Sequence, residues 1–251
     1  MSISDFNQKT ALVTGASRGF GRAIAAALSG AGAQVVGVAR HPQPLEDLGD
    51  ELGVAFRGVV GDVRDAGLAR ELLLEHHPQI LVLNAGAIPV TGPLHQQTWE
   101  SFSHNWEVDT RHVFNWTTES LRMPLAPGSA VIALSSGAAI AGSPLSGGYA
   151  SAKAAIRFIS AYAAGESERS ELGIRFTALL PQLTPTTDLG AAAVAIYAER
   201  EGVDIQTFLE RFDPILTPEQ VGKAVVELCG DDRQGSELAY LLSGAGLREI
   251  P

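Results

Sequence analysis

A glycine-rich turn between an apolar strand and a helix constrains the fold of this chain more than any other segment. Residues 10–14, TALVT, form a short apolar run of the kind found in buried strands. The turn GASRGFG occupies 15–21, and the following RAIAAALSGAG reads as a helix that ends in glycines. This order of elements favours a nucleotide-binding unit, because glycines let the backbone turn tightly and approach a pyrophosphate. The alternative is that the glycines only let the helix pack on the strand.

The rest of the chain alternates between apolar runs and helical segments. Strands are expected at 34–40, 54–63, 80–86, 129–136, 173–181 and 239–244, and helices at 45–52, 65–76, 98–122, 149–170 and across much of 188–229. This alternation predicts a Rossmann-type, doubly wound α/β fold with about seven parallel strands and helices on both faces. No linker or repeat divides the sequence, so we expect one dinucleotide-binding and catalytic domain, 1–251.

Composition argues against several classes of partner. A net charge of −10 and a pI of about 5.0 disfavour non-specific binding to nucleic acid or to an anionic membrane surface. The sequence has no run of 18 apolar residues and no evident signal peptide. A single cysteine, Cys229, excludes an internal disulfide, and together with mostly dispersed histidines it argues against a metal cluster. We therefore expect a cytoplasmic protein without a metal.

Two arginines bear on the choice of cofactor. A carboxylate at the end of the second strand would bind the ribose hydroxyls and repel a 2′-phosphate, yet this strand ends in Ala39-Arg40. Arg18 lies in the glycine turn, and both guanidiniums can hold one phosphate as bidentate donors. We therefore predict NADP(H) as the cofactor, the alternative being that both arginines are solvated at the surface.

Two further strand ends carry polar residues. Asp62 and Val63 close the third strand, where the carboxylate can accept the adenine amino group and the valine can contact the ring. The alternative for Asp62 is a cap for the helix that follows. Asn84, Ala85 and Gly86 close the fourth strand at the carboxyl edge of the sheet, where ligands bind in such folds.

Tyr149 and Lys153 are four residues apart at the start of a predicted helix, so they share one helix face. An ammonium beside a phenol favours the phenolate, which suits a side chain that gives and takes a proton near neutral pH. The alternative is that Tyr149 packs and Lys153 is solvated.

Together these motifs resemble those of the short-chain dehydrogenases/reductases, specifically their compact, single-domain branch. TGASRGFG, GDV, LNAG, the Ser-Ser pair that closes the fifth strand and YASAK occur in the family's order and approximate spacing, over about residues 9–186. The resemblance implies that Tyr149 is the general acid in reduction and the base in oxidation. It also implies that Lys153 supports the ionised tyrosine and holds the nicotinamide ribose, and that Ser136 polarises the substrate.

The resemblance also implies specific cofactor contacts. Arg40 matches the position typical of NADP-binding members, and Ala39 the position where NAD-binding members carry Asp. In the P-G-x-x-x-T motif the threonine contacts the nicotinamide amide, and this chain has Gln182 in place of the glycine. The residues so implied are Gly15, Ser17, Arg18, Gly19, Phe20 and Gly21 in the turn, and Pro181, Leu183 and Thr186 in the later motif.

One departure from the family concerns Asp109. Family members usually carry Asn there, in a V-N-x-x-x-x-F pattern, where it supports a water relay to the lysine. Asp109 falls within one apolar stripe at helical spacing, formed by Trp99, Phe102, Trp106, Val113 and Trp116. A buried carboxylate must be paired, hydrogen-bonded or protonated, and our hypothesis is that Asp109 replaces the Asn. The alternative is a solvated Asp109 at the helix edge, and we expect the aromatic residues in the core or at a subunit interface.

These residues predict an NADPH-dependent carbonyl reductase, or equivalently an alcohol dehydrogenase, acting on a small carbonyl or alcohol. The alternatives are a C=N or C=C reductase of the same family and a non-catalytic NADP-binding sensor or scaffold. Residues 184–216 are expected to form a substrate lid with a largely apolar wall, although they suit an ordinary helix core equally well. By resemblance, the helices at 98–122 and 149–170 pair between the subunits of a dimer or tetramer.

Overall fold

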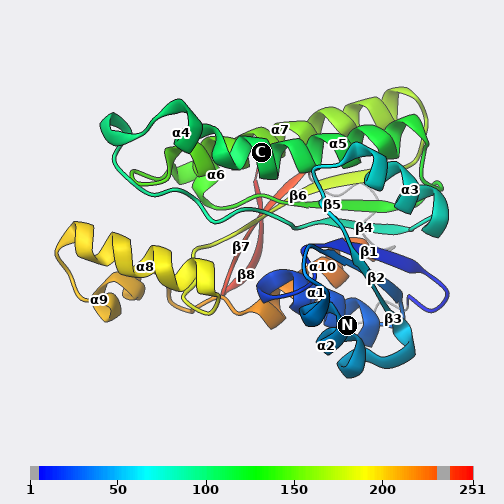
Figure 1. Ribbon diagram of the computed structural model, residues 1–251, viewed down its shortest axis with the longest axis horizontal. Helices are drawn as coiled ribbons and strands as arrows, with labels where there is room; N and C mark the ends of the chain where they lie inside the picture. Colours follow the sequence, from blue (N-terminus) through cyan, green and yellow to red (C-terminus); the bar gives the residue numbers. More distant parts are fainter. Residues whose placement is uncertain (1–5, 231–237, 251) are drawn as a thin grey trace.

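The computed structural model, which describes residues 6–230 and 238–250, is built on an eight-stranded sheet in the order β3-β2-β1-β4-β5-β6-β7-β8 (Figure 1). Seven strands run parallel: β1 Thr10–Thr14, β2 Gln34–Ala39, β3 Phe56–Val60, β4 Ile80–Leu83, β5 Ala130–Leu134, β6 Arg175–Pro181 and β7 Ala239–Ser243. The predicted Rossmann-type α/β fold is confirmed. An eighth strand, β8 (Gly246–Ile250), was not predicted and pairs antiparallel with β7 at the sheet edge.

Helices cover both faces of the sheet (Figure 1). One face carries α1 Gly19–Gly30, α2 Pro42–Leu52 and α10 Pro218–Cys229, and the other carries α3 Ala66–His76, α5 Arg111–Arg122 and α7 Gly147–Arg169. The apolar core is accordingly split into two layers. Ile24, Leu28 and Val225 belong to the first layer, whereas Trp116 and Ile156 belong to the second. Because β1, β4 and β5 are buried between these layers, they appear in the sequence as short apolar runs.

The helix expected at 98–122 is continuous but contains a π-helical turn. It consists of α4 Trp99–Asn105, the π turn Trp106–Thr110 and α5. A π turn adds a residue to the helical repeat, so side chains on either side of it no longer share one face. Trp116 and Val113 are buried, whereas Trp99 is 77% exposed and Trp106 is 39% exposed. The prediction of one apolar stripe along this helix is therefore wrong in its N-terminal half.

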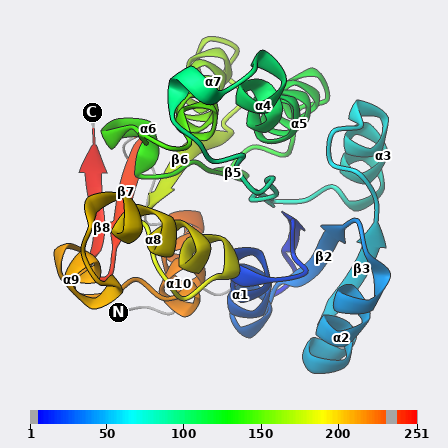
Figure 2. The ribbon, with the colours of Figure 1, turned by 60° about the vertical axis from the view of Figure 1, so that its left-hand side comes forward.

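The segment between β6 and α10 forms a small helical unit beside the C-terminal strands (Figure 2). It contains α8 Asp188–Glu201, α9 Ile205–Leu209 and a 3₁₀ turn, Glu210–Phe212. Phe208 stacks on Tyr197 and contacts Phe212, so several apolar residues of this unit pack on one another. The remaining short elements are α6 Ala138–Ala141 and the 3₁₀ turns Gly53–Ala55 and Leu94–Gln96. Within the described residues, no helix is long and apolar enough to cross a membrane.

Candidate active site

The carboxyl ends of the parallel strands meet at one edge of the sheet, and the predicted site residues follow these ends. Gly15 follows β1, Asn84 follows β4, and Ser136 lies two residues beyond β5. Since neighbouring strands are in register, these short exits lie side by side. Ligands bind at this edge in open α/β sheets.

The glycine turn has a backbone that only glycine accommodates. Gly15 has a φ of +69°, and a Cβ there would lie 2.8 Å from the Cα of Ala85. The Asn84 side chain holds the turn from the neighbouring strand, because its Nδ2 donates to the carbonyls of Thr14 and Gly15, at 3.0 and 3.2 Å. The predicted Asn84 thus has a structural contact to the turn that sequence reasoning missed.

The turn presents the start of α1 to the same edge of the sheet. Arg18 is the N-cap residue of α1, with extended backbone and no side-chain cap, so the first N–H groups of the helix are available to a ligand. Free N–H groups and the positive end of the helix dipole suit a pyrophosphate. Ser17, Gly19 and Phe20 are half-buried around this turn.

The two arginines predicted to bind a 2′-phosphate are both exposed. Arg40 follows β2 directly. One guanidinium nitrogen of Arg18 lies 3.8 Å from Asp188 at the start of α8, in a solvent-exposed ion pair that contributes little stability.

Asp62 is held by Arg64, a contact that sequence reasoning missed. The Arg64 Nε donates to both carboxylate oxygens, at 3.1 and 3.0 Å, and its Nη2 donates to Oδ2 at 2.6 Å. The hydrogen bonds from Arg64, with a contribution from the Arg40 charge, lower the pKa of Asp62 to about 2 although burial opposes the shift. The alternative role of Asp62 as a helix cap is wrong, because the Asp65 side chain accepts from the Gly67 N–H and caps α3.

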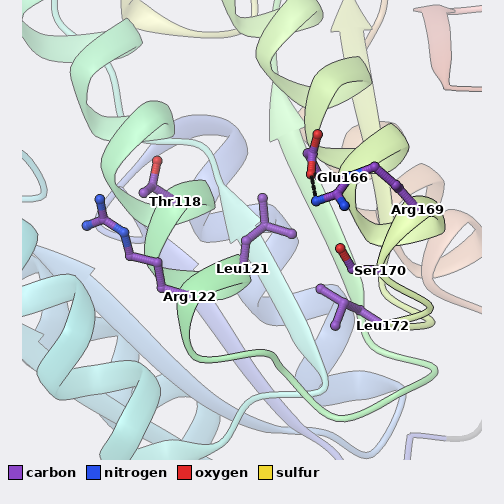
Figure 3. Close-up of a pocket in the computed structure, with 7 residues that line it drawn as sticks. All are labelled: Thr118, Leu121, Arg122, Glu166, Arg169, Ser170 and Leu172. Atoms are coloured by element: carbon purple, nitrogen blue, oxygen red, sulfur yellow. Dashed lines mark hydrogen bonds and ion pairs between the residues drawn. The ribbon is translucent and has the colours of Figure 1, made fainter.

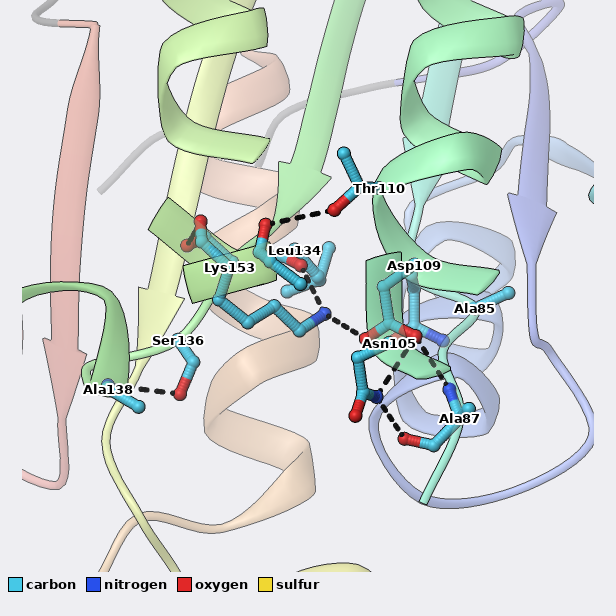
Figure 4. Close-up of polar contacts among 12 residues, drawn as sticks. Ala85, Ala87, Asn105, Asp109, Thr110, Leu134, Ser136, Ala138 and Lys153 are labelled. Atoms are coloured by element: carbon cyan, nitrogen blue, oxygen red, sulfur yellow. Dashed lines mark hydrogen bonds and ion pairs between the residues drawn. The ribbon is translucent and has the colours of Figure 1, made fainter. Parts of the chain in front are cut away.

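Lys153 is buried against the end of β5. Its Nζ donates to the Leu134 carbonyl at 3.0 Å and lies 5.6 Å from the ring centre of Tyr149, one helical turn earlier. The Ser135 hydroxyl donates to the Lys153 carbonyl at 2.7 Å, which fixes α7 to the strand. Ser136 is half-buried, and its hydroxyl accepts from the Ala138 N–H at 3.2 Å (Figure 4).

Asp109 is 1% exposed and pairs with Lys153, the Oδ2–Nζ distance being 3.3 Å (Figure 4). Its Oδ1 accepts from the Ala87 N–H at 2.8 Å and from Asn105 Nδ2 at 3.4 Å. Burial disfavours a charged Lys153, but Asp109 and Tyr149 outweigh it and raise the pKa of the lysine. The alternative of a solvated Asp109 is therefore wrong.

Two local features let the Asp109 carboxylate reach Lys153. Asp109 belongs to the π turn and lies on the same buried helix face as Val113 and Trp116. A Cβ at Gly86 would lie 2.9 Å from Asp109 Oδ2, so the glycine leaves room for the carboxylate. Asn105 also donates to the Ala87 carbonyl at 3.0 Å, and its role was not evident from the sequence.

His112 is a second buried residue that sequence reasoning missed. It is fully buried, three residues beyond Asp109, with its ring edge-on to Trp116. Burial, together with repulsion by the Lys153 charge, lowers the pKa of His112 to about 3. The imidazole is therefore neutral over the physiological pH range.

The predicted nicotinamide-side residues lie where β6 ends. Pro181 is the last residue of β6, and Leu183 is half-buried just beyond it. The Thr186 hydroxyl donates to the Leu216 carbonyl at 3.2 Å and contacts the Thr184 hydroxyl at 2.8 Å. These bonds tie the exit of β6 to the segment that precedes α10.

A hollow of about 290 Å³ lies between the C-terminal ends of α5 and α7 (Figure 3). Glu166, in its wall, follows Tyr149 by seventeen residues on α7, which is about 25 Å along a helix axis. This hollow is therefore remote from Tyr149. Across residues 6–230 and 238–250, no group of three or more His, Cys, Asp or Glu is placed to hold a metal.

Known proteins share this sequence pattern and fold. The family model described as short chain dehydrogenase matches residues 9–195. A serine 3-dehydrogenase of Agrobacterium fabrum is 34% identical over 188 residues, covering 70% of this chain and 72% of that protein. Versicolorin reductase 1 of Dothistroma septosporum is 27% identical over 249 residues, covering 92% and 93%.

Two solved structures superpose over nearly the whole chain, each at 26% identity. A dehydrogenase/reductase from Sinorhizobium meliloti has a TM-score of 0.81 and covers 95% of this chain and 94% of its own. A putative NAD(P) dependent gluconate 5-dehydrogenase from Beutenbergia cavernae, with NADP bound at low occupancy, has a TM-score of 0.79, with 94% and 95% covered. Because the family model matches most of this chain, the protein belongs to the short-chain dehydrogenase family and is an oxidoreductase of a type that uses NAD(P)(H).

Proposed function

We propose that the protein is an NADP(H)-dependent oxidoreductase that transfers hydride between the nicotinamide and a carbonyl or alcohol substrate. One observation carries this proposal: Lys153 is buried between Asp109 and the end of β5, one helical turn from Tyr149. Burying a charged lysine costs free energy even when it is ion-paired, so its place beside the half-buried Tyr149 phenol supports a catalytic role for the two side chains.

A nicotinamide cofactor bound at this edge of the sheet would supply the hydride for the carbonyl carbon. Ser136 and Tyr149 hold the carbonyl oxygen through their hydroxyls, and Tyr149 gives that oxygen its proton as negative charge develops there. The Lys153 ammonium stabilises the tyrosine anion that remains until a proton is returned. In alcohol oxidation the same groups act in reverse, with Tyr149 as the base.

The preference for NADP(H) rests on charge near the end of β2. Arg40 is exposed where a carboxylate would otherwise bind the ribose, and Arg18 lies in the neighbouring turn. Arg64 pairs with the Asp62 carboxylate, which reduces the negative potential that a 2′-phosphate would meet. Arg40, Arg18 and Arg64 therefore bring three positive charges to this region, against the carboxylates of Asp62 and Asp188.

Asp109 takes the place of the Asn that supports the proton relay in related enzymes. Its carboxylate contacts Lys153 on one side and the Ala87 N–H on the other. It thus holds the lysine in position and compensates part of its charge.

The lid and the subunit contacts are further parts of the proposal. Residues 184–216 are attached to the site through hydrogen bonds between the Tyr197 hydroxyl of α8 and the hydroxyls of Ser143 and Ser146, and we expect this segment to cover the substrate. Exposed aromatic side chains on the α4–α5 and α7 helices support pairing of subunits in a dimer or tetramer: Trp99, Trp106, Phe114, Phe158 and Tyr162.

Purified protein and NADPH, mixed with a panel of ketones, test the proposal. Loss of absorbance by NADPH, with the matching alcohol formed in equal amount, is the expected result. A C=N or C=C reductase would instead consume NADPH only with imines or enones. Tight NADPH binding without turnover on any of the three classes would favour a sensor or scaffold.

A further inference from the structure

We infer that the substrate is an uncharged, apolar carbonyl compound rather than a keto or hydroxy acid. The inference rests on the proposed carbonyl reduction and specifies the substrate class of the same site. It is carried by the charge and exposure of the segments that surround Ser136 and Tyr149.

We define the substrate frame as residues 86–98, 137–148, 182–187 and 189–198. Hydrogen bonds join these segments around the two hydroxyls. The Gly92 N–H donates to the Leu145 carbonyl at 2.7 Å, and the Gly137 N–H donates at 2.9 Å to the carbonyl of Pro181, which directly precedes the third segment. The Tyr197 hydroxyl links α8 to the same stretch, 3.1 Å from the Ser146 hydroxyl. Ser136 and Tyr149 directly flank the second segment, so a bound carbonyl lies against the frame.

The substrate frame contains no Asp, Glu, Lys or Arg in its 41 residues. Asp188, which lies between the last two segments, faces Arg18 at the start of α8. The titratable side chains of the frame are His95 and Tyr197. A substrate carboxylate would therefore enter the site without a cation from the frame, which is costly because a buried charge needs a partner.

Apolar side chains of the frame are exposed instead. Ile88 is 59% exposed, Leu94 73% and Ile140 52%. Val90 and Leu189 are exposed as well, at 45% and 37%. Large apolar side chains that stay exposed around a catalytic pair are typical of a surface that a ligand covers.

Several charged residues near the frame are engaged with other groups of the protein. Asp109 and Lys153 pair with one another in the interior. At the start of α8 Asp188 faces Arg18, and at its end Glu201 accepts two hydrogen bonds from Arg211. The cations Lys153, Arg18 and Arg211 thus each face a carboxylate of the protein rather than a substrate acid.

A matched set of substrates tests this inference with purified protein and NADPH. The set contains the neutral ketones 2-butanone, 2-pentanone, 2-hexanone and 2-heptanone, the charged acid 5-oxohexanoate and its neutral methyl ester. We expect kcat/KM to rise about threefold to fourfold for each added methylene, as burial of apolar surface predicts. We expect the ester to exceed the free acid by at least about a hundredfold, because only the acid brings an unpaired charge.

Lysine substitutions in the frame test whether its apolar side chains determine the preference for uncharged ketones. Ile140→Lys and, separately, Leu94→Lys place a cation on the frame and should lower kcat/KM for 2-heptanone by at least about tenfold while raising it for 5-oxohexanoate. Val54→Lys is the matched control, because Val54 is 101% exposed beside β3, outside the frame. All variants should bind NADPH with unchanged Kd.

The possible results separate the inference from the proposed function. Faster reduction of 5-oxohexanoate than of its ester overturns the inference and leaves carbonyl reduction intact. A flat kcat/KM along the ketone series also overturns it. Absence of NADPH oxidation with every member of the set, although NADPH binds, overturns the proposed function itself.

Discussion

Replacing Asp109 with Asn removes one charge from the buried pair and keeps the size of the side chain. Asn can still accept the Ala87 N–H, and it restores the residue that related enzymes usually carry there. The ammonium of Lys153 then acts on Tyr149 without a compensating carboxylate. We expect the phenolate to be favoured more strongly in the variant than in the wild type.

The size of this effect follows from the distances. Lys153 Nζ lies 5.6 Å from the Tyr149 ring centre and 3.3 Å from Asp109 Oδ2, so the carboxylate oxygen is at most about 9 Å from the ring centre. Two unit charges at about 9 Å interact by about 1.8 kcal/mol at an effective dielectric constant of about 20. Since about 1.4 kcal/mol corresponds to one pH unit, the pH–rate profile should move by about one unit or slightly more.

The assay is kcat/KM for alcohol oxidation with NADP⁺ as a function of pH. The phenolate is the base in this direction, so the midpoint of the rise in rate should move to lower pH in Asp109→Asn. Asp50→Asn, an exposed carboxylate on α2, is the control and should leave the profile unchanged. Superimposable profiles for wild type and Asp109→Asn would remove Asp109 from the mechanism, and a shift to higher pH would contradict the electrostatic reasoning.

Three further predictions concern cofactor choice, acid stability and the glycine turn. Arg40→Ala should lower the NADPH/NADH ratio of kcat/KM by about 10-fold to 100-fold, as loss of a charge-assisted hydrogen bond predicts; an unchanged ratio would contradict the assignment. His112 has a pKa of about 3 when folded and about 6.5 ordinarily, so the unfolded chain gains a proton first as the pH falls. Its contribution to stability is complete above pH 6.5 and is lost on the way to pH 3. The loss of folding free energy should reach about 2 kcal/mol at pH 5, measured by urea titration, and His112→Phe should not show this loss. Gly15→Ala should lower the free energy of unfolding by about 1–3 kcal/mol and weaken NADPH binding, because its φ of +69° and the nearby Ala85 both exclude a Cβ; unchanged binding would show that the turn does not hold the cofactor.

Much of the fold could be predicted because local pattern and tertiary environment agree. The run TALVT coincides with β1, since a central parallel strand buried on both faces is continuously apolar. The edge strand β8 was missed because GLREI carries two charged residues and is mostly exposed. Charged residues are common on edge strands, where they discourage pairing with other chains. They also interrupt the apolar run by which a buried strand is recognised in the sequence.

The candidate site could be predicted as a set of residues but not as a set of contacts. The motifs identify Tyr149 and Lys153, because their spacing follows from the helix repeat. The burial of Asp109 agrees with its place in the predicted stripe. The sequence does not reveal the π turn, so the exposure of Trp99 and Trp106 followed only from the structure. The Asp62–Arg64 ion pair and the hydrogen bond from Asn84 to the glycine turn also depend on side-chain geometry at strand ends. The spacing of apolar residues in the sequence does not reveal this geometry.

Turnover by Tyr149→Phe tests the central claim most directly. The variant keeps the ring and loses the hydroxyl that we assign as the proton donor. We predict that NADPH-dependent reduction of the best ketone falls by at least about a hundredfold while the Kd for NADPH stays within about twofold. Tyr162→Phe, at a position 68% exposed on the same helix, should behave as wild type. Substantial turnover by Tyr149→Phe with intact cofactor binding would contradict the account.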